Sequence, residues 1–150
     1  MTLRIATRAD TAELWRVRYA VTENTLTPGC ISDAELHAHL EDFGRGWVVE
    51  LAPLPDLRIA GFAIGDARNG NVWAMFVDPI CHGQGHGRAL HDAMVGWLFS
   101  TGLQRLSLGT QPGSRAEAFY RRAGWRALHI DEHGERRFER LASDWNPAHA

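Results

Sequence analysis

Apolar residues recur along the chain with two different periods, which separate predicted helices from predicted strands. A spacing of three or four positions places side chains on one face of a helix. This spacing follows three helix-start signals, at Asp10, Ser32 and Ser114, and it also runs from about Gly87 to Ser100. Gly102 and Gly124 follow the last two of these segments in chain order, as expected for residues just past a helix end. The pattern therefore predicts about four helices.

Each of the three helix-start signals has the form of a capping box. In a capping box, the first side chain accepts a hydrogen bond from the helix backbone, and a Glu three positions later reaches back to the start. The three boxes are Asp10–Glu13, Ser32–Glu35 and Ser114–Glu117.

Alternating or continuous apolar runs predict seven strands. They cover Leu3–Thr7, Trp47–Leu51, Arg58–Ile64, Val72–Val77, Leu103–Leu108, Trp125–Ile130 and Glu135–Leu141. The run Val72–Val77 is apolar throughout, which is typical of a central strand covered on both faces. No element is predicted for the tail that contains Trp145 and Pro147. The order β-α-α-β-β-β-α-β-α-β-β indicates an α+β fold, a mixed α/β sandwich of one sheet between helices.

Composition narrows the possible classes of protein. The chain has 150 residues, of which 45% are hydrophobic and 23% are charged, and its formal net charge is −2. At this length we expect a single domain, residues 1–150, with its core at about 3–141. A basic stripe typical of nucleic-acid binding is missing. No apolar run approaches the roughly 18 residues of a membrane span, and the N-terminus does not resemble a signal peptide. We therefore expect a cytoplasmic protein without nucleic-acid or membrane partners.

The reactive side chains that the chain contains and lacks exclude several further kinds of catalytic and binding site. All 16 basic residues are arginines, so no lysine is present to form a Schiff base or to bind phosphate in a Walker loop. Two cysteines, Cys30 and Cys81, are too few for a disulfide scaffold. His82, His86 and His91 lie close together, but no Cys-His pairing or His-Glu-x-x-His motif accompanies them. We expect no metal, and we expect His86 and His91 to be loop and helix-surface residues.

The strongest local signal is a glycine-rich turn between the strand Val72–Val77 and the following helix. It contains Gly83, Gly85 and Gly87, which allow a tight backbone turn or the close approach of a ligand. Free N–H groups and the positive end of the helix dipole form an anion site at such a helix start. The dinucleotide fingerprint G-x-G-x-x-G fails in both registers of this loop. A plain strand-to-helix turn is the alternative interpretation.

The loop resembles the pyrophosphate loop of the GNAT superfamily of acetyl-CoA-dependent N-acetyltransferases. Val77-Asp78-Pro79 is followed at the family's spacing by Gly85-x-Gly87, and His82 stands where Gln or Arg is usual. This resemblance implies a GNAT-like fold, with one central, mostly antiparallel mixed sheet of about six or seven strands flanked by about four helices.

A second segment resembles the same family. Ala116, Phe119, Tyr120 and Gly124 match the family's Ala-x-x-Phe-Tyr-x-x-x-Gly-Phe pattern, and Trp125 replaces the final Phe. The family often has Asn seven residues before the tyrosine, where this chain has Gly113. Thr110 or Ser114 could replace that Asn in a hydrogen bond to the pantetheine arm of coenzyme A.

The resemblance implies direct transfer of an acetyl group from acetyl-CoA to a primary amine in a ternary complex. It implies that a backbone N–H polarises the thioester where the central strand bulges, in the stretch Met75–Val77. Tyr120 would protonate the departing thiolate as a general acid, although without the motif it reads as an interfacial aromatic residue. The expected cofactor-binding residues are Met75, Phe76, Val77, His82, Gly83, Gln84, Gly85, His86, Gly87, Arg88, Ser114 and Tyr120.

The acceptor side of the reaction is less defined by the sequence. The central strand carries no carboxylate, and the candidates for a general base are Glu23, Glu50, His37 and His129, each equally an ordinary surface residue. Arg16, Arg18, Glu23 and Asn24 lie near the family's acceptor wall, and a solvated helix face is the favoured interpretation.

The preferred function is acetylation of a small-molecule amine, with a homodimer as a possible assembly. Three alternatives stay open. They are a protein N-terminal acetyltransferase, a non-enzymatic CoA-binding sensor on the same fold, and a mononucleotide-binding enzyme that uses the loop for another phosphate.

Overall fold

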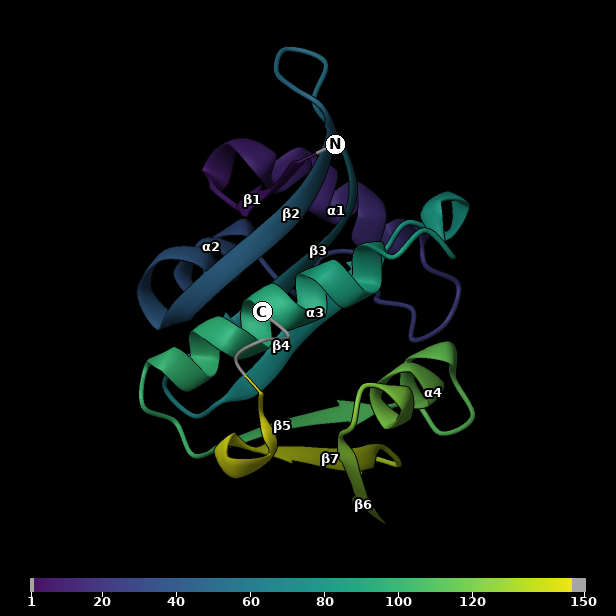
Figure 1. Ribbon diagram of the computed structural model, residues 1–150. Helices are drawn as coiled ribbons and strands as arrows, with labels where there is room; N and C mark the ends of the chain where they lie inside the picture. The colour runs from purple at the N-terminus through teal and green to yellow at the C-terminus, as the bar shows by residue number, and fades with distance from the viewer. Residues whose placement is uncertain (1, 147–150) are drawn as a thin grey trace.

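The computed structural model describes residues 2–146, which form one seven-stranded sheet with helices on both faces (Figure 1). The strands are β1 Thr2–Ile5, β2 Gly44–Ala52, β3 Arg58–Asp66, β4 Asn71–Val77, β5 Arg105–Thr110, β6 Arg126–Ile130 and β7 Arg136–Leu141. The α-helices are α1 Thr11–Ala20, α2 Asp33–Ala38, α3 His86–Ser100 and α4 Arg115–Arg122. Short 3₁₀ or π turns cover Arg8–Asp10, His39–Phe43, Pro79–Cys81 and Ala142–Asp144. Pro147, part of the tail for which no element was predicted, lies outside the described residues.

The strands follow the order β1-β2-β3-β4-β5-β7-β6 across the sheet. Every neighbouring pair is antiparallel except β4 and β5, which run parallel. The predicted order of elements and the mixed, mostly antiparallel sheet with about four helices are therefore confirmed. Boundaries differ by a few residues, as the predicted strand Leu103–Leu108 begins at Arg105 and ends at Thr110.

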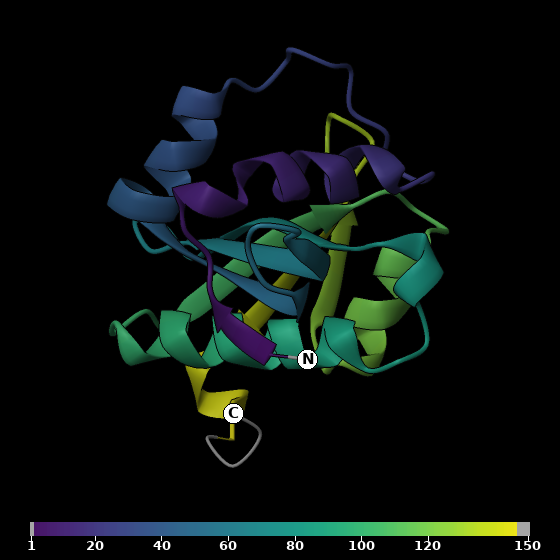
Figure 2. The same cartoon turned by 90° about the horizontal axis from the view of Figure 1, so that it is seen from above.

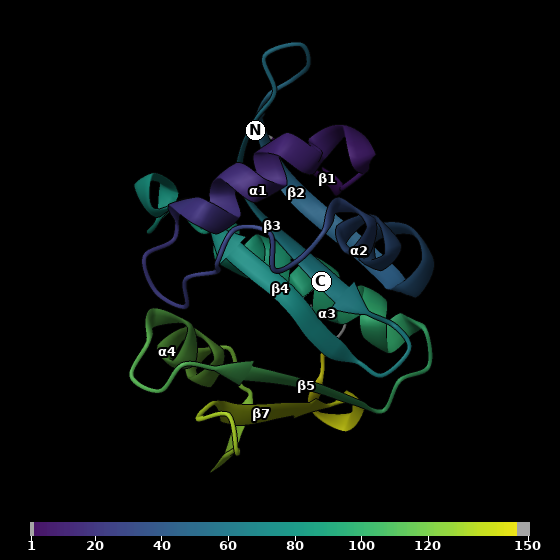
Figure 3. The same ribbon diagram turned by 180° about the vertical axis from the view of Figure 1, so that it is seen from behind.

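The parallel pair is the weakest connection in the sheet. β4 and β5 share one register pair, Asn71 with Ser107, and the Ser107 N–H donates to the Gly70 carbonyl at 3.0 Å. Beyond this point the two strands diverge toward their C-terminal ends (Figure 3). A register shift in the pairing of β3 with β4 leaves Trp73 as an extra residue in β4. Such a bulge bends a strand and increases its twist. The bulge was expected in the stretch Met75–Val77. It lies just before this stretch, at Trp73.

Two apolar layers cover the two faces of the sheet (Figure 2). On one face, α1 and α2 contribute Leu14, Val17 and Leu36 to a cluster with residues of β2 and β3. On the other face, α3 and α4 form the larger cluster, which includes Leu90 and Tyr120. Each helix therefore buries the apolar stripe that its spacing predicted.

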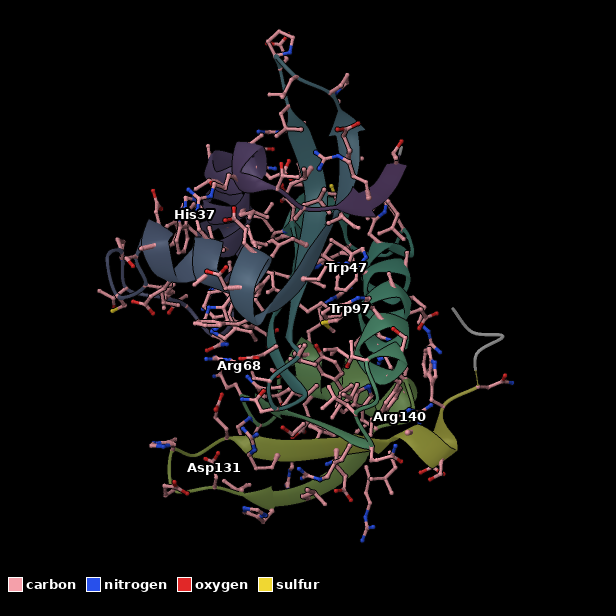
Figure 4. All side chains as sticks on the ribbon, turned by 90° about the vertical axis from the view of Figure 1, so that its left-hand side faces the viewer. His37, Trp47, Arg68, Trp97, Asp131 and Arg140 are labelled. Atoms are coloured by element: carbon pink, nitrogen blue, oxygen red, sulfur yellow. The ribbon has the colours of Figure 1, made fainter. Side chains whose placement is uncertain are left out.

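Trp47 and Trp97 illustrate the packing of the larger layer. The indole of Trp47, from β2, meets that of Trp97, from α3, with ring centroids 5.7 Å apart (Figure 4). Trp47 is buried in this core. No helix in the described part of the chain is both long and apolar enough to cross a membrane.

Two of the three predicted capping boxes supply the expected caps. The hydroxyl oxygens of Ser32 and Ser114 each accept a hydrogen bond from the N–H three residues later, at 3.1 Å. The box predicted at Asp10 is wrong. Asp10 is buried and accepts from the Thr7 N–H at 2.8 Å while it pairs with Arg4. Glu13 instead accepts from the Ile59 N–H at 3.0 Å, so it connects α1 to β3.

His91 is fully buried rather than on the helix surface, so that expectation is also wrong. Its Nε2 accepts from Trp125 Nε1–H at 2.8 Å, and its Nδ1 lies 2.8 Å from the carboxylate of Asp92. A ring that accepts at one nitrogen and donates at the other is a neutral imidazole. Burial lowers the pKa of His91 and thereby favours this neutral form. His86 is buried as well, against expectation.

The variant His91→Leu should be less stable than the parent and less sensitive to acid. The substitution leaves the Trp125 N–H unpaired in the core, which lowers the free energy of unfolding by about 1–3 kcal/mol near neutral pH. In the parent, stability that is present above the ordinary histidine pKa of 6.5 is lost as pH falls, because the unfolded ring binds a proton that the buried ring resists. Thermal unfolding of both proteins from about pH 7.5 to 5 should show a shallower slope for the variant.

His133→Leu is the matched control, because His133 lies exposed in the turn between β6 and β7. Its melting curves should follow the parent. Equal pH slopes for His91→Leu and the parent would contradict a buried neutral imidazole.

Candidate active site

A cleft of about 360 Å³ lies where β4 and β5 separate. The chain after α1 forms one wall, through residues 21–24. The rest of the lining comes from residues 72–77 of β4, the C-terminal half of β5, the glycine-rich loop and α4. The opening of the sheet and the predicted loop therefore belong to the same place in the fold.

The loop backbone exposes a row of unpaired donors. Gly83 and Gly85 have φ angles of +78° and +84°, which favour glycine, and open space lies where a Cβ would stand. Gly85 is the residue before α3, and no side chain caps this helix start. Within residues 2–146, no acceptor is found for the backbone N–H groups from Gly83 to Arg88. Such donors at the positive end of a helix dipole are suited to a phosphate group.

Gly87 differs from the other two loop glycines. A Cβ at this position would meet Phe119 at 3.5 Å and Val77 at 3.7 Å, which are ordinary contacts. Gly87 therefore has neither a left-handed backbone nor a Cβ position that its neighbours block.

The loop histidines are turned toward the protein. Nε2 of His82 lies 3.2 Å from the Val77 carbonyl oxygen, which can only accept, so Nε2 carries the proton. The Nε2–H of His82 is therefore directed at the protein backbone rather than at a phosphate oxygen. His86 lines the cleft and bonds Gln84 at 3.1 Å, whereas Gln84 itself is exposed and outside the lining. Arg88 lines the cleft and pairs with Asp92 at 3.3 Å.

The backbone of β4 presents two N–H groups to the gap. The Asp78 N–H donates to the Ala60 carbonyl at 2.8 Å, and β3 and β4 then pair in register from Gly61 with Val77. Because alternate residues of an antiparallel strand face the same neighbour, the Phe76 N–H turns toward β3. The N–H groups of Met75 and Val77 turn toward the separated side. Of the stretch expected to supply an oxyanion donor, the register thus selects Met75 and Val77 and removes Phe76.

Tyr120 places a buried phenol at the cleft. Its hydroxyl lies 3.7 Å from Met75 Sδ, and this contact is the one hydrogen bond found for it within the described chain. Burial raises the pKa of Tyr120, so the hydroxyl keeps its proton. The side chain is therefore a protonated donor inside the cleft rather than an interfacial aromatic residue with its hydroxyl in water.

Two hydroxyls were candidates for a contact to the pantetheine arm. Ser114 lines the cleft, but its oxygen already accepts from the Glu117 N–H at the start of α4. Thr110, at the end of β5, is buried in the lining, and its Oγ1 finds no partner in the part of the chain that is described. Buried hydroxyls are rarely left unpaired. The geometry thus favours Thr110 over Ser114 as the group that awaits a ligand.

Of the four candidate bases, only Glu23 lines the cleft. Its Oε2 accepts from the Arg115 N–H at 2.9 Å, at the first turn of α4. Glu50 pairs with Arg4 at 3.0 Å, and His37 bonds Thr11 at 3.0 Å among α1 and α2, away from α4 (Figure 4). His129 lies exposed on β6 and lines no described cavity.

The favoured interpretation of Arg18, a solvated helix face, is wrong. This residue is 9% exposed and lies on the buried side of α1, not on a solvated face. Arg16 is not a free surface charge either, because it pairs with Asp78 at 2.7 Å. The signal for Arg18 was its position four residues after Leu14 and next to Val17, within the apolar stripe. Among the residues described, no group of three or more His, Cys, Asp or Glu gathers as a metal site would require.

A model of the acetyltransferase (GNAT) family matches residues 10–125. This chain belongs to the GNAT family. It is accordingly an acetyltransferase, and its family uses acetyl-CoA as co-substrate. A search of curated proteins finds no match.

Solved structures share the fold of this GNAT acetyltransferase at low sequence identity. The ribosomal-protein-S18-alanine N-acetyltransferase from Escherichia coli aligns with TM-score 0.68 and 18% identity, over 92% of this chain and 90% of its own. The ribosomal-protein-alanine N-acetyltransferase from Brucella melitensis gives TM-score 0.71 and 19% identity, over 94% and 99%. A Vibrio cholerae spermidine N-acetyltransferase chimera gives TM-score 0.72 and 18%, over 95% of both. At these identities the likeness establishes the fold and leaves the acceptor open.

The variant Gly85→Asp should bind acetyl-CoA at least about tenfold more weakly than the parent, because it adds a negative charge beside the free N–H groups. Gly134→Asp is the matched control. Its φ is +81° with open space around the Cβ position, so it shares the backbone strain, but it lies in the turn between β6 and β7. Isothermal titration with acetyl-CoA checks both variants. Undiminished affinity in Gly85→Asp would mean that the diphosphate binds elsewhere.

Proposed function

We propose that this GNAT acetyltransferase transfers the acetyl group of acetyl-CoA to the amine of a small molecule. One observation carries the proposal. Unpaired N–H groups of the loop and of β4 line a single cleft, so an anion site and a donor for a developing negative charge lie side by side. A sensor or a mononucleotide site needs the first of these features but not the second.

The cleft residues divide the binding of acetyl-CoA among them. The N–H groups from Gly83 to Arg88 hold the diphosphate, and the Arg88 side chain adds positive charge at the rim. The unpaired hydroxyl of Thr110 bonds an amide of the pantetheine arm. The extended pantetheine arm lies along the free edge of β4, at Met75 and Val77, as an added strand would.

The transfer requires stabilisation of charge at two atoms. As the amine nitrogen forms its bond to the thioester carbon, negative charge grows on the carbonyl oxygen, and a backbone N–H of Met75 or Val77 stabilises it. The carbon–sulfur bond then breaks and leaves a thiolate. Tyr120 gives its proton to that sulfur. Its hydroxyl is free for this task because it is bound only to a thioether sulfur.

The amine must lose a proton before or during the attack. An ammonium with a pKa near ~10.4 is almost entirely charged at neutral pH. Glu23 is the carboxylate among the cleft residues, and it accepts the proton directly or through water. Its bond to the Arg115 N–H holds it at the α4 end of the cleft.

Tyr120→Phe should lower kcat for thiol release by at least about tenfold, since a positioned acid typically contributes about 10²-fold or more, and it should leave the affinity for acetyl-CoA nearly unchanged. The fold should survive because the substitution removes one weak contact to sulfur. Tyr19→Phe is the matched control, as Tyr19 is exposed and stacks on Trp15 outside the cleft. The assay records free thiol released from acetyl-CoA with a panel of small amines.

Each outcome of this assay has a consequence. Unchanged turnover in Tyr120→Phe would remove the acid role. Tight binding of acetyl-CoA without thiol release for any amine would favour the non-enzymatic sensor. Acetylation of peptide N-termini in preference to every small amine would favour a protein N-terminal acetyltransferase.

A further inference from the structure

A second cavity, of about 130 Å³, lies against the opposite side of β4 from α4. Apolar and aromatic side chains from α1, α2 and β4 form most of its lining. Arg18 is its one charged lining residue, and Asn24 is the other strongly polar one. The cavity therefore surrounds a single cation with apolar surface.

Within the described chain, no carboxylate pairs with Arg18. Its side chain contacts the ring of Phe76, with the guanidinium carbon 4.3 Å from the ring centroid. Nη1 is inaccessible to solvent and bonds nothing within residues 2–146. No Asp or Glu belongs to the lining of this cavity. Burial without a counter-charge lowers the pKa of Arg18.

The other inward-lying arginines of the chain contrast with Arg18. Arg4 pairs with Asp10 and Glu50, and Arg16 pairs with Glu13 and Asp78.

Two further arginines have a buried nitrogen without a hydrogen bond, but each has a partner at another atom or a nearby opposite charge. Arg140 donates to the Gly124 carbonyl, and Arg136 lies 3.4 Å from Glu117. A buried guanidinium N–H group without an acceptor is costly. At Arg18, the described chain supplies no anion to balance the buried positive charge.

The cavity adjoins the acetyl-transfer cleft. Asn24, Trp73, Ala74 and Phe76 line both. These residues stand at the bulge of β4 and in the segment after α1, so the cavity that Arg18 lines borders the cleft from the side opposite α3 and α4. A molecule that presents its amine to the cleft can thus place another group beside Arg18.

We propose that the acceptor is a small amino acid with an apolar side chain, whose carboxylate pairs with Arg18. This inference rests on the proposed acetyl transfer and names its substrate class. The planar guanidinium matches a carboxylate through two parallel hydrogen bonds. The apolar walls, which include Trp73 and Phe62, receive the side chain. A polyamine does not fit, because its positive charges would face an uncompensated cation.

Matched pairs of acceptors test the proposal on the unaltered protein. L-Leucine is compared with 3-methylbutylamine, and L-phenylalanine with 2-phenylethylamine, because each pair differs in the carboxylate. We expect kcat/KM to be at least tenfold higher for the amino acid in one of the pairs or in both. Equal or higher values for both amines that lack the carboxylate, or preference for spermidine, would overturn the inference.

The variant Arg18→Gln tests the residue itself. It should raise KM for the preferred amino acid at least tenfold, with kcat and the acetyl-CoA affinity changed little and with KM for the matched amine unchanged. Arg45→Gln is the control, because Arg45 also stacks on an aromatic ring, 4.8 Å from the centroid of Trp97, but lies outside both cavities. An unchanged preference in Arg18→Gln would overturn the assignment of Arg18.

A binding measurement tests this inference separately from the proposed function. It also provides a test if Arg18→Gln folds poorly. N-Acetyl-L-leucine, with CoA present, should raise the melting temperature of the parent and of Arg18→Lys more than N-acetyl-3-methylbutylamine does. Equal shifts would overturn the inference. If acetyl-CoA itself binds and is turned over while the carboxylate has no effect, only the substrate class fails. If acetyl-CoA does not bind, the proposed function fails.

Discussion

The separation of β4 from β5 is the constraint on which the rest of the structure depends. A parallel pair held at a single position leaves the facing edges of the two strands without partners beyond it, while β4 stays paired with β3 and β5 with β7. In a sheet interior, unpaired N–H and C=O groups are unfavourable unless another polar group satisfies them. The bulge at Trp73 and the antiparallel ladder with β3 determine which N–H groups face the gap. The gap is therefore suited to a ligand that supplies both hydrogen-bonding groups along its length and negative charge.

Unsatisfied polar groups lie around this gap on both sides of the strand. The loop N–H groups and the Thr110 hydroxyl line the side that faces α3 and α4, and Arg18 lies on the side that faces α1. One set is suited to phosphates and amides, and the other to a single anion in apolar surroundings. Two ligands that meet at the free edge of β4 would satisfy both sets. This arrangement is what direct transfer between two bound substrates requires.

The sequence predicted the fold well because the signals involved are local. Helical spacing, serine caps and the continuous apolar run of β4 depend on neighbours along the chain, and they located the elements to within a few residues. The glycine loop was recognisable for the same reason, since the turn before α3 requires left-handed backbone at Gly83 and Gly85. The resemblance of this loop and of the Phe119–Tyr120 segment to one family then indicated the activity.

The remaining features depend on tertiary contacts that local patterns do not contain. Asp10 closes on Arg4 rather than capping α1, and His91 is buried because Trp125 supplies a donor from another element. Which N–H of β4 faces the gap follows from strand register and from a one-residue bulge. Arg18 lies within an apolar stripe, and only the packing of α1 on β4 shows that its charge is enclosed.

The most direct test of the account follows the amide hydrogens of the glycine loop. Hydrogen–deuterium exchange, read by NMR for each residue, is measured with and without CoA. Because the N–H groups from Gly83 to Arg88 lack protein acceptors, we predict that CoA slows their exchange strongly, together with that of Met75 or Val77 in β4. Protection confined to other segments, with the loop amides unchanged, would contradict the account.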